Sequence, residues 1–241
     1  MLSGTVKSRL MPRVMPAVSL RRVANLPAPV VNLVRLLVVL SAAFVLHADP
    51  VIVYSKYFKG SKPENVIITV TKSGDTEYKE AANDDQPIKF KLTEAQTAEI
   101  FSLSDKLGHF SKPLESPAKV AHMGWKTFHY EDGADKHEVK FNYSENLDAQ
   151  ALQDWFERIT ETEQDFIDLD RTVHFDKLGV NQSILMVEIT YDRKRLIAPE
   201  QFLPLLDRVA KNESYIHMAR ERAANLAEMF RNNKTAQAGP Q

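Results

Sequence analysis

Hydrophobic and polar residues alternate along the first half of the chain, from about residue 51 to residue 143. In NVIITVTK the even positions from Val66 to Val70 are apolar, whereas Thr69 and Thr71 are polar. A period of two is typical of a strand with one buried face and one wet face. The pattern predicts about six short strands, in the segments VIVYSKYF, NVIITVTK, TEYKE, IKFKL, WKTFHY and KHEVKFNY.

Two short turn sequences predict how neighbouring strands are joined. Ser73-Gly74-Asp75 and Asp132-Gly133 contain residues that tolerate positive φ. Such residues close hairpins between antiparallel strands. The sheet is therefore expected to be antiparallel, with Val139, Phe141 and Tyr143 on one face of its last strand.

One helix is predicted within this set of strands. Thr93 and Gln96 fit a capping box, in which each side chain satisfies a free backbone N–H of the first turn. Ile100, Leu103 and Leu107 then form an apolar stripe, and Gly108 is suited to a left-handed helix end. The stripe is expected to pack on the apolar face of the sheet.

After Asn146 the apolar period changes to about three and a half, which predicts a long helix whose seam faces other helices. The seam consists of Leu152, Trp155, Ile159, Thr162, Phe166, Leu169 and Val173. Gly179 is expected to end this helix in a Schellman motif, with Val180 touching Phe175. A second helix should follow from Asn181 to about Ile197, although SILMVEITY is β-branched enough to form a strand.

The last predicted helix opens at Asn212, after a break at Ala198-Pro199 and a second proline at Pro204. The fold class is thus α+β: an antiparallel sheet of about six short strands with one packing helix, followed by a helical hairpin and a C-terminal helix. The expected divisions are an N-terminal segment at 1–48, the sheet with its helix at 49–146, a helical region at 147–232 and a disordered tail at 233–241.

The most apolar stretch lies near the N-terminus, from Leu36 to Leu46. Its 11 residues are too few to span a bilayer, which needs roughly 20. A basic leader without acidic residues precedes it, and Ala48 suits a cleavage site. The segment predicts a secretory signal peptide cleaved after Ala48 and a periplasmic or secreted protein. The alternative is an uncleaved anchor that holds the protein to the membrane through residues 36–46.

Composition narrows the classes of partner and chemistry. Without residues 1–48 the chain has 25 basic and 32 acidic side chains, so we expect no nucleic-acid partner. It has no cysteine, which excludes disulfides, thiolate metal sites and a cysteine nucleophile.

Acidic residues are concentrated between residues 145 and 170. This segment contains nine Asp or Glu residues and one basic residue, Arg158. A helical hairpin turning at Gly179 would place the basic residues 193–195 opposite residues 165–167. We interpret the acidic run as a solvated helix face partly paired across that hairpin. Calcium binding is disfavoured because helical carboxylates diverge instead of converging around a glycine turn.

Histidines and aromatic residues supply the only candidate site. His122, His129 and His137 fall on adjacent predicted strands, but alternation places His122 and His129 on opposite faces, and we predict no metal site. The candidate is a ligand patch for a peptide or sugar, formed by Trp125, His129, Tyr130 and His137.

No catalytic motif for a serine hydrolase, a zinc protease or a phosphate-binding loop occurs, so catalytic residues are unknown and no cofactor is predicted. The predicted function is an exported, non-catalytic binding or structural protein of the bacterial cell envelope, with an envelope protein or peptide as partner. The alternative is an envelope hydrolase whose metal or carboxylate site is assembled only in the fold. A third class, a helix-mediated oligomer, predicts that Leu152, Trp155 and Phe166 are exposed in one subunit.

Overall fold

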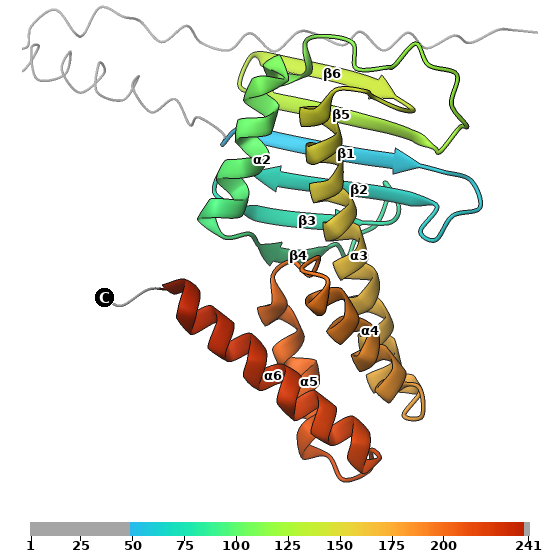
Figure 1. The fold of residues 1–241 in the computed structure, drawn as a ribbon, viewed down its shortest axis with the longest axis vertical. Helices are drawn as coiled ribbons and strands as arrows, with labels where there is room; N and C mark the ends of the chain where they lie inside the picture. The colour runs from blue at the N-terminus through green and yellow to red at the C-terminus, as the bar shows by residue number, and fades with distance from the viewer. Residues whose placement is uncertain (1–48, 239–241) are drawn as a thin grey trace, which may run out of the picture. The chain divides into compact units, whose positions relative to one another are not determined.

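A computed structural model describes the backbone of residues 49–238 and the side chains of residues 49–232. The predicted signal peptide, its cleavage site and the alternative anchor at 36–46 lie outside the described residues. The described chain forms one antiparallel sheet of six strands in the order β4-β3-β2-β1-β5-β6 (Figure 1). The strands are β1 Val51–Tyr57, β2 Asn65–Thr71, β3 Asp75–Lys79, β4 Ile88–Lys91, β5 Trp125–Asp132 and β6 Asp135–Phe141.

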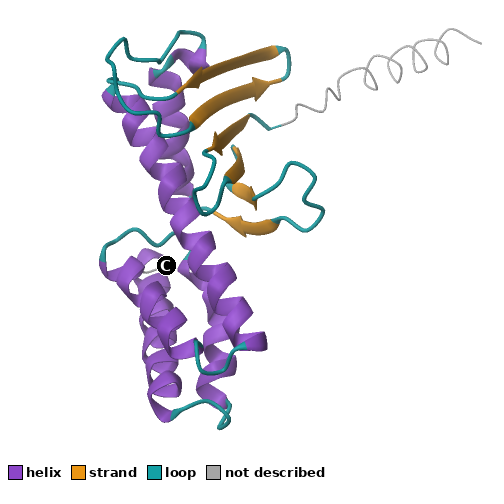
Figure 2. Ribbon diagram, turned by 90° about the vertical axis from the view of Figure 1, so that its right-hand side faces the viewer, coloured by secondary structure: helices purple, strands orange, loops and turns teal. Residues whose placement is uncertain are grey.

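One α-helix and a short 3-10 helix interrupt the strands in the sequence, the remaining helices follow β6, and together they confirm the α+β class. They are α2 Glu94–Lys106, η2 Gly108–Phe110, α3 Leu147–Phe175, α4 Val180–Asp192, η3 Pro199–Phe202, α5 Leu203–Lys211 and α6 His217–Ala238. Both α2 and the first half of α3 lie on the same face of the sheet (Figures 1 and 2). The opposite face is not covered by any helix of residues 49–238. No helix within residues 49–238 is both long and apolar enough to cross a membrane.

The alternation in the sequence correctly predicts which face of the sheet is buried. Val66, Ile68 and Val70 of β2 are all in the core beneath α2 and α3. Tyr143 differs from the expectation, since 38% of its side chain is exposed. The reason is that β6 ends at Phe141, so the strand period no longer fixes the direction of residue 143.

The start and end of α2 also follow the prediction. Gln96 N donates to Thr93 Oγ1, and Thr93 N donates to Gln96 Oε1, so the capping box is complete. Gly108 has a φ of +60° just after the helix. The stripe that includes Ile100 and Leu103 is buried against the sheet, as expected.

The long helix α3 packs against two different cores, which corrects the expectation that its seam faces other helices throughout. Leu152, Phe156 and Ile159 belong to the core under the sheet. Leu169 and Val173 belong to a second core formed with α4, α5 and α6. The seam residues named for an oligomer are covered within one chain: Leu152 and Trp155 are buried, and Phe166 packs against the second core.

The turn after α3 differs from the predicted Schellman motif. Gly179 has a φ of −73° and is the N-terminal cap of α4, so it does not end α3 in a left-handed conformation. Phe175 is 86% exposed, whereas Val180 is fully buried, so the two do not form the expected contact. Asp176 organises the turn, because its Oδ1 accepts hydrogen bonds from the backbone N–H groups of Leu178 and Gly179. A Cβ on Gly179 would lie 2.5 Å from Asp176 Oδ2, so a larger residue there would require the Asp176 carboxylate to shift.

The segment after this turn is a helix and not a strand. Val180, Ile184 and Val187 are fully buried at helical spacing in the second core, so packing overrides the β-branched composition. This helix ends at Asp192, earlier than the expected Ile197, and Ile197 packs instead into the core beneath the sheet.

The last helix begins later than predicted. Asn212 is the C-terminal cap of α5, and its Oδ1 accepts a hydrogen bond from Ser214 N. α6 therefore starts at His217, and Ile216 is half exposed. α6 continues to Ala238, within the expected tail at 233–241, whose last three residues lie outside the described chain.

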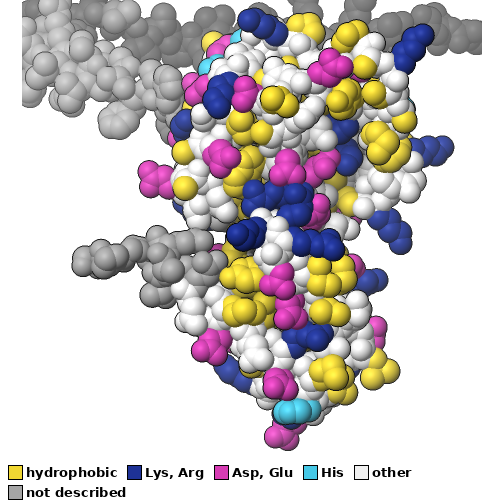
Figure 3. Space-filling model, in the orientation of Figure 1, with side chains coloured by type: hydrophobic (Ala, Val, Ile, Leu, Met, Phe, Trp, Pro, Cys, Tyr) yellow, Lys and Arg dark blue, Asp and Glu magenta, His cyan; other side chains and the backbone are white. Residues whose placement is uncertain are grey.

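Acidic and basic side chains pair across the helical hairpin, but in a shifted register. Thr190 Oγ1 donates to Asp165 Oδ2 at 2.6 Å. The turn is therefore centred near residues 177 and 178 and not at Gly179. As a result Arg195 lies opposite Glu161 and Asp154, at 2.6 and 2.9 Å, and not opposite residues 165–167. Figure 3, in the orientation of Figure 1, shows basic side chains with acidic neighbours across the middle of the molecule.

Candidate functional site

The predicted patch of Trp125, His129, Tyr130 and His137 is divided between the two faces of the sheet. In the β5–β6 hairpin, His129 is paired with Glu138 and Tyr130 is paired with His137. Directly paired residues share a face, and neighbours along a strand point to opposite faces. Trp125 and His129 therefore lie on the face that no described helix covers. Tyr130 and His137 lie on the other face.

Each half of the patch has its own local partners. His129 lies 3.6 Å from Glu131 and 3.7 Å from Glu138. The ring of Tyr130 is stacked under His109, with centroids 4.0 Å apart, so it is not free to bind a ligand. His122 accepts a hydrogen bond from Gly124 N. Among residues 49–232, no group of three or more His, Asp or Glu side chains is placed to hold a metal ion.

Trp125 is the member of the patch that lines an open hollow. The hollow has a volume of about 330 Å³ and is also lined by Tyr57, Phe58, Lys59 and His122. The ammonium of Lys140 lies 4.9 Å from the centroid of a Trp125 ring. This hollow is aromatic and solvent-open.

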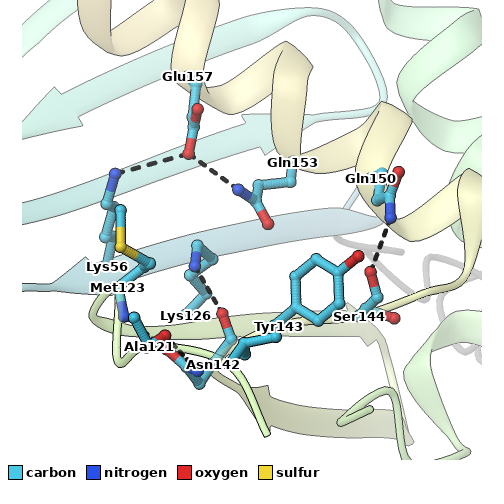
Figure 4. A pocket seen from close by; sticks show the side chains of 11 residues that line it. Lys56, Ala121, Met123, Lys126, Asn142, Tyr143, Ser144, Gln150, Gln153 and Glu157 are labelled. Atoms are coloured by element: carbon cyan, nitrogen blue, oxygen red, sulfur yellow. Dashed lines mark hydrogen bonds and ion pairs between the residues drawn. The ribbon is translucent and has the colours of Figure 1, made fainter. Parts of the chain in front are cut away.

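A larger cleft of about 630 Å³ lies on the helix-covered side, between the sheet and the first half of α3 (Figure 4). Side chains from β1, β5, the end of β6, the loop before β5 and α3 converge on it. Its lining comprises Lys56, Val120, Ala121, Met123, Lys126, Asn142, Tyr143, Ser144, Gln150, Gln153 and Glu157. This cleft combines buried charge with exposed apolar surface and is the candidate functional site.

Two lysines lie at the centre of the cleft. Lys56 of β1 and Lys126 of β5 are direct cross-strand partners, so both point to the helix-covered face. Lys126 is only 4% exposed, and its Nζ donates to the backbone carbonyl of Asn142 at 2.7 Å. Burial, followed by the neighbouring Lys56 ammonium, lowers the pKa of Lys126. Lys126 is thus a desolvated amine without a carboxylate in hydrogen-bond contact.

A single carboxylate, Glu157 of α3, lines the opposite wall of the cleft. Lys56 Nζ is 3.5 Å from Glu157 Oε1, and Gln153 Nε2 donates to the same oxygen at 2.9 Å. Figure 4 shows Glu157 directed at Lys56, while Lys126 reaches toward Asn142. The carboxylate therefore compensates Lys56 more directly than Lys126.

The walls of the cleft are held in place by hydrogen bonds. Asn142 Oδ1 accepts from Met123 N at 2.8 Å, which fixes the loop before β5. Gln150 Nε2 of α3 donates to the carbonyl of Ser144 at 2.9 Å. Gly124 has a φ of +90°, and a Cβ there would lie 2.6 Å from the Cβ of Phe58. Only glycine allows the loop to come this close to the end of β1.

The sequence contained a signal for this site that the prediction did not use. In WKTFHY, Lys126 shares the strand face of Phe128, which is a core position. In VIVYSKYF, Lys56 shares the face of Ile52 and Tyr54. A lysine on the apolar face of a strand is rarely buried without a specific reason. The alternation alone was therefore sufficient to identify Lys56 and Lys126 as candidate residues of a functional site.

A second unusual carboxyl group, Glu163 of α3, lies outside the cleft. Glu163 is fully buried where α3 passes from one core to the other, and this burial raises the pKa of its carboxyl group to about 8. Gln201 Nε2 of η3 donates to Glu163 Oε1 at 3.0 Å. Neither Glu163 Oε2 nor Gln201 Oε1 has a hydrogen-bond partner within the described structure. A proton on Glu163 would supply a donor for the Gln201 oxygen, which is consistent with the raised pKa.

Comparison of the chain with models of protein families, with curated proteins and with solved structures gives no match. The chemistry of the residues in the cleft is therefore the basis for a functional proposal.

Proposed function

We propose that this protein is an exported, non-catalytic binding protein of the bacterial cell envelope, and that its ligand occupies the cleft over Lys126. The observation that carries the proposal is a buried lysine at the floor of a preformed cleft of about 630 Å³. Cavities of this size are typical of sites for small molecules or short peptide segments. Export and a periplasmic or secreted location are supported by the basic leader and the short apolar run in residues 1–48.

The arrangement of the cleft favours binding over hydrolysis. Its one carboxylate, Glu157, is engaged through Oε1 by Lys56 and Gln153, and no second carboxylate or histidine among the described residues lines the cleft to act with it as an acid–base pair. A general base for hydrolysis needs an accepting oxygen within reach of a water or a nucleophile. The alternative of an envelope hydrolase relied on His129 and His137, which lie on opposite faces of the sheet. No observation on the described residues favours that alternative.

Export is tested in the bacterium that produces the protein. Cells are fractionated, and the N-terminus of the recovered protein is sequenced. We expect a chain that begins at Asp49 in the periplasmic or secreted fraction. A full-length chain in the membrane fraction would instead support the anchor formed by residues 36–46, and a full-length chain in the cytosol would contradict export.

Ligand binding at the cleft is tested by NMR on the protein labelled with ¹⁵N, titrated with a small-molecule extract of the cell envelope. The side-chain amides of Gln150 and Gln153 are direct reporters, because both line the cleft. We expect their signals to shift saturably, and we expect the Lys126→Met variant to lose these shifts. Lys89→Met is the matched control, since Lys89 is exposed on β4 and pairs with Glu77. Shifts confined to other surfaces would contradict the proposed site.

A further inference from the structure

The cleft contains an unusual pairing of like charges. Lys56 and Lys126 are directly opposite each other on adjacent antiparallel strands, and both face α3. Like charges in this relation are destabilising in a sheet. The cost increases when one of the two is buried, as Lys126 is, because desolvation also disfavours its charged form. The fold thus maintains a charge arrangement that packing alone does not require.

The carboxylates nearby compensate this charge incompletely. Glu157 Oε1 lies 3.5 Å from Lys56 Nζ, whereas the Lys126 ammonium donates to the neutral backbone carbonyl of Asn142. Glu115 does not line the cleft, and its Oε2 accepts a hydrogen bond from the backbone N–H of Asn142. Both carboxylates favour the charged form of Lys126, but burial and Lys56 outweigh them, so the pKa of Lys126 is lowered. The lining therefore holds two ammonium groups and one carboxylate.

The remaining surface of the cleft is partly apolar. Val120 is 45% exposed, Met123 is 57% exposed and Tyr143 is 38% exposed, and all three line the cleft. The side-chain amides of Gln150 and Gln153 lie along the α3 wall and supply polar groups that can orient a ligand. Exposed apolar side chains beside an under-compensated buried cation indicate a ligand with both an apolar and an anionic part.

We propose that the cleft binds an organic monoanion whose carboxylate contacts the Lys126 ammonium and whose apolar body contacts Val120, Met123 and Tyr143. This inference rests on the proposed binding function and specifies the chemical class of its ligand. The charges favour a carboxylate over a phosphate dianion, because two ammonium groups and one carboxylate line the cleft, and Glu115 behind the lining offsets part of the remaining positive charge. A small carboxylic acid and the free C-terminus of a peptide present the same group.

The inference is tested by calorimetry and NMR on the full-length chain with matched probes. Hexanoate represents a small acid, and N-acetyl-Ala-Leu represents a peptide C-terminus. Hexanamide and N-acetyl-Ala-Leu-amide have nearly the same shape without the charge, and hexyl phosphate carries the dianion. We expect one or both carboxylates to bind at least roughly tenfold more tightly than their amides, as a charge-assisted contact to a buried ammonium requires. The stronger of the two carboxylates identifies the source.

Variants separate the role of Lys126 from general effects on folding. Lys126→Met is expected to remove the preference for carboxylate over amide, and Lys126→Arg to retain part of it, while Lys89→Met leaves it unchanged. Thermal unfolding of each variant shows whether it is folded. If Lys126→Met does not fold, the pKa of Lys126, followed through its ¹³Cε signal, replaces it as the readout. It should rise when a carboxylate binds, because the bound anion favours the ammonium.

The results distinguish failure of this inference from failure of the proposed function. Equal binding of amides and carboxylates, tighter binding of hexyl phosphate, or no binding of either carboxylate overturns the monoanion inference. The proposed function survives those results if the envelope extract still shifts the signals of Gln150 and Gln153. If the extract shifts neither signal, the proposed function itself is wrong.

Discussion

Glu163 offers the most direct test of the packing between the two cores. Its carboxyl group is fully buried, and burial raises its pKa from 4.5 to about 8, although the hydrogen bond from Gln201 opposes the shift. At pH 6 the folded protein should therefore hold a proton on Glu163 that the unfolded chain has largely released. The neutral acid and the Gln201 amide can then form two hydrogen bonds, with the amide N–H donating to Oε1 and the acid O–H donating to Oε1 of Gln201.

The sign of the pH dependence follows from the raised pKa. Between pH 4.5 and about 8 the folded state binds more protons at this group than the unfolded state does, so the free energy of unfolding falls as pH rises. Each pKa unit corresponds to about 1.4 kcal/mol, so the full window corresponds to about 5 kcal/mol of lost stability. The Glu163→Gln variant stays neutral at every pH, and its amide can donate to the Gln201 oxygen in place of the acid.

The measurement is urea unfolding, followed by circular dichroism, of the natural protein and of Glu163→Gln between pH 4.5 and pH 9. We expect similar stabilities at pH 4.5 and a variant that is about 3 to 5 kcal/mol more stable at pH 8.5. Glu99→Gln, on the exposed face of α2, is the control and should follow the natural protein. The comparison also cancels the contribution of Asp165, whose pKa burial raises as well. If the curves for the natural protein and Glu163→Gln are parallel, the Glu163 carboxyl is not protonated in the folded state.

Three further substitutions test particular contacts by the same unfolding measurement. Thr162→Val removes the hydroxyl that accepts a buried backbone N–H of the segment before η3, and should cost about 1 to 3 kcal/mol, whereas Thr162→Ser should retain most of that stability. Gly179→Ala should destabilise by no more than about 1 kcal/mol, because the added Cβ displaces the exposed Asp176 carboxylate from its turn hydrogen bonds, while alanine itself is favoured over glycine at this negative φ. An equal loss in the Asp176→Ala background would contradict that cause. Phe156→Ala removes a ring stacked on Tyr54 at 4.7 Å and should cost about 3 to 5 kcal/mol; a loss below 1 kcal/mol would show that this core is loosely packed.

Local patterns in the sequence were sufficient for the elements that depend on neighbouring residues. The alternation in β2 identifies its buried face, because side chains two apart in a strand share a side. Thr93 and Gln96 mark the start of α2, because a capping box is completed within four residues. The apolar period after Asn146 identifies α3, because residues three and four positions apart lie on the same side of a helix. These features do not depend on where the rest of the chain lies.

The register of the β5–β6 hairpin decided the outcome for the predicted patch. Asp132 pairs with Asp135, so the loop has two residues, and His129 pairs with Glu138. With any two-residue loop His129 and His137 fall on opposite faces, whereas a three-residue loop would place them on the same face. The Asp132-Gly133 signal predicted a hairpin but not the length of its loop. Loop length, through the strict alternation of side chains, therefore separated residues that are close in sequence.

Only the tertiary structure determined what each predicted face packs against. A helical period gives the direction of an apolar stripe but not its partner, so the passage of α3 from the sheet to the helical core was not predictable. The polar pair Thr162 and Glu163 lies where the two cores meet, and its partners come from residues more than 30 positions away. The pairing of Lys56 with Lys126 likewise joins strands that are far apart in sequence. The sequence by itself determined the elements and their buried faces, because those depend on local backbone geometry. The cleft and the buried charges required contacts between distant segments, which only the folded chain brings together.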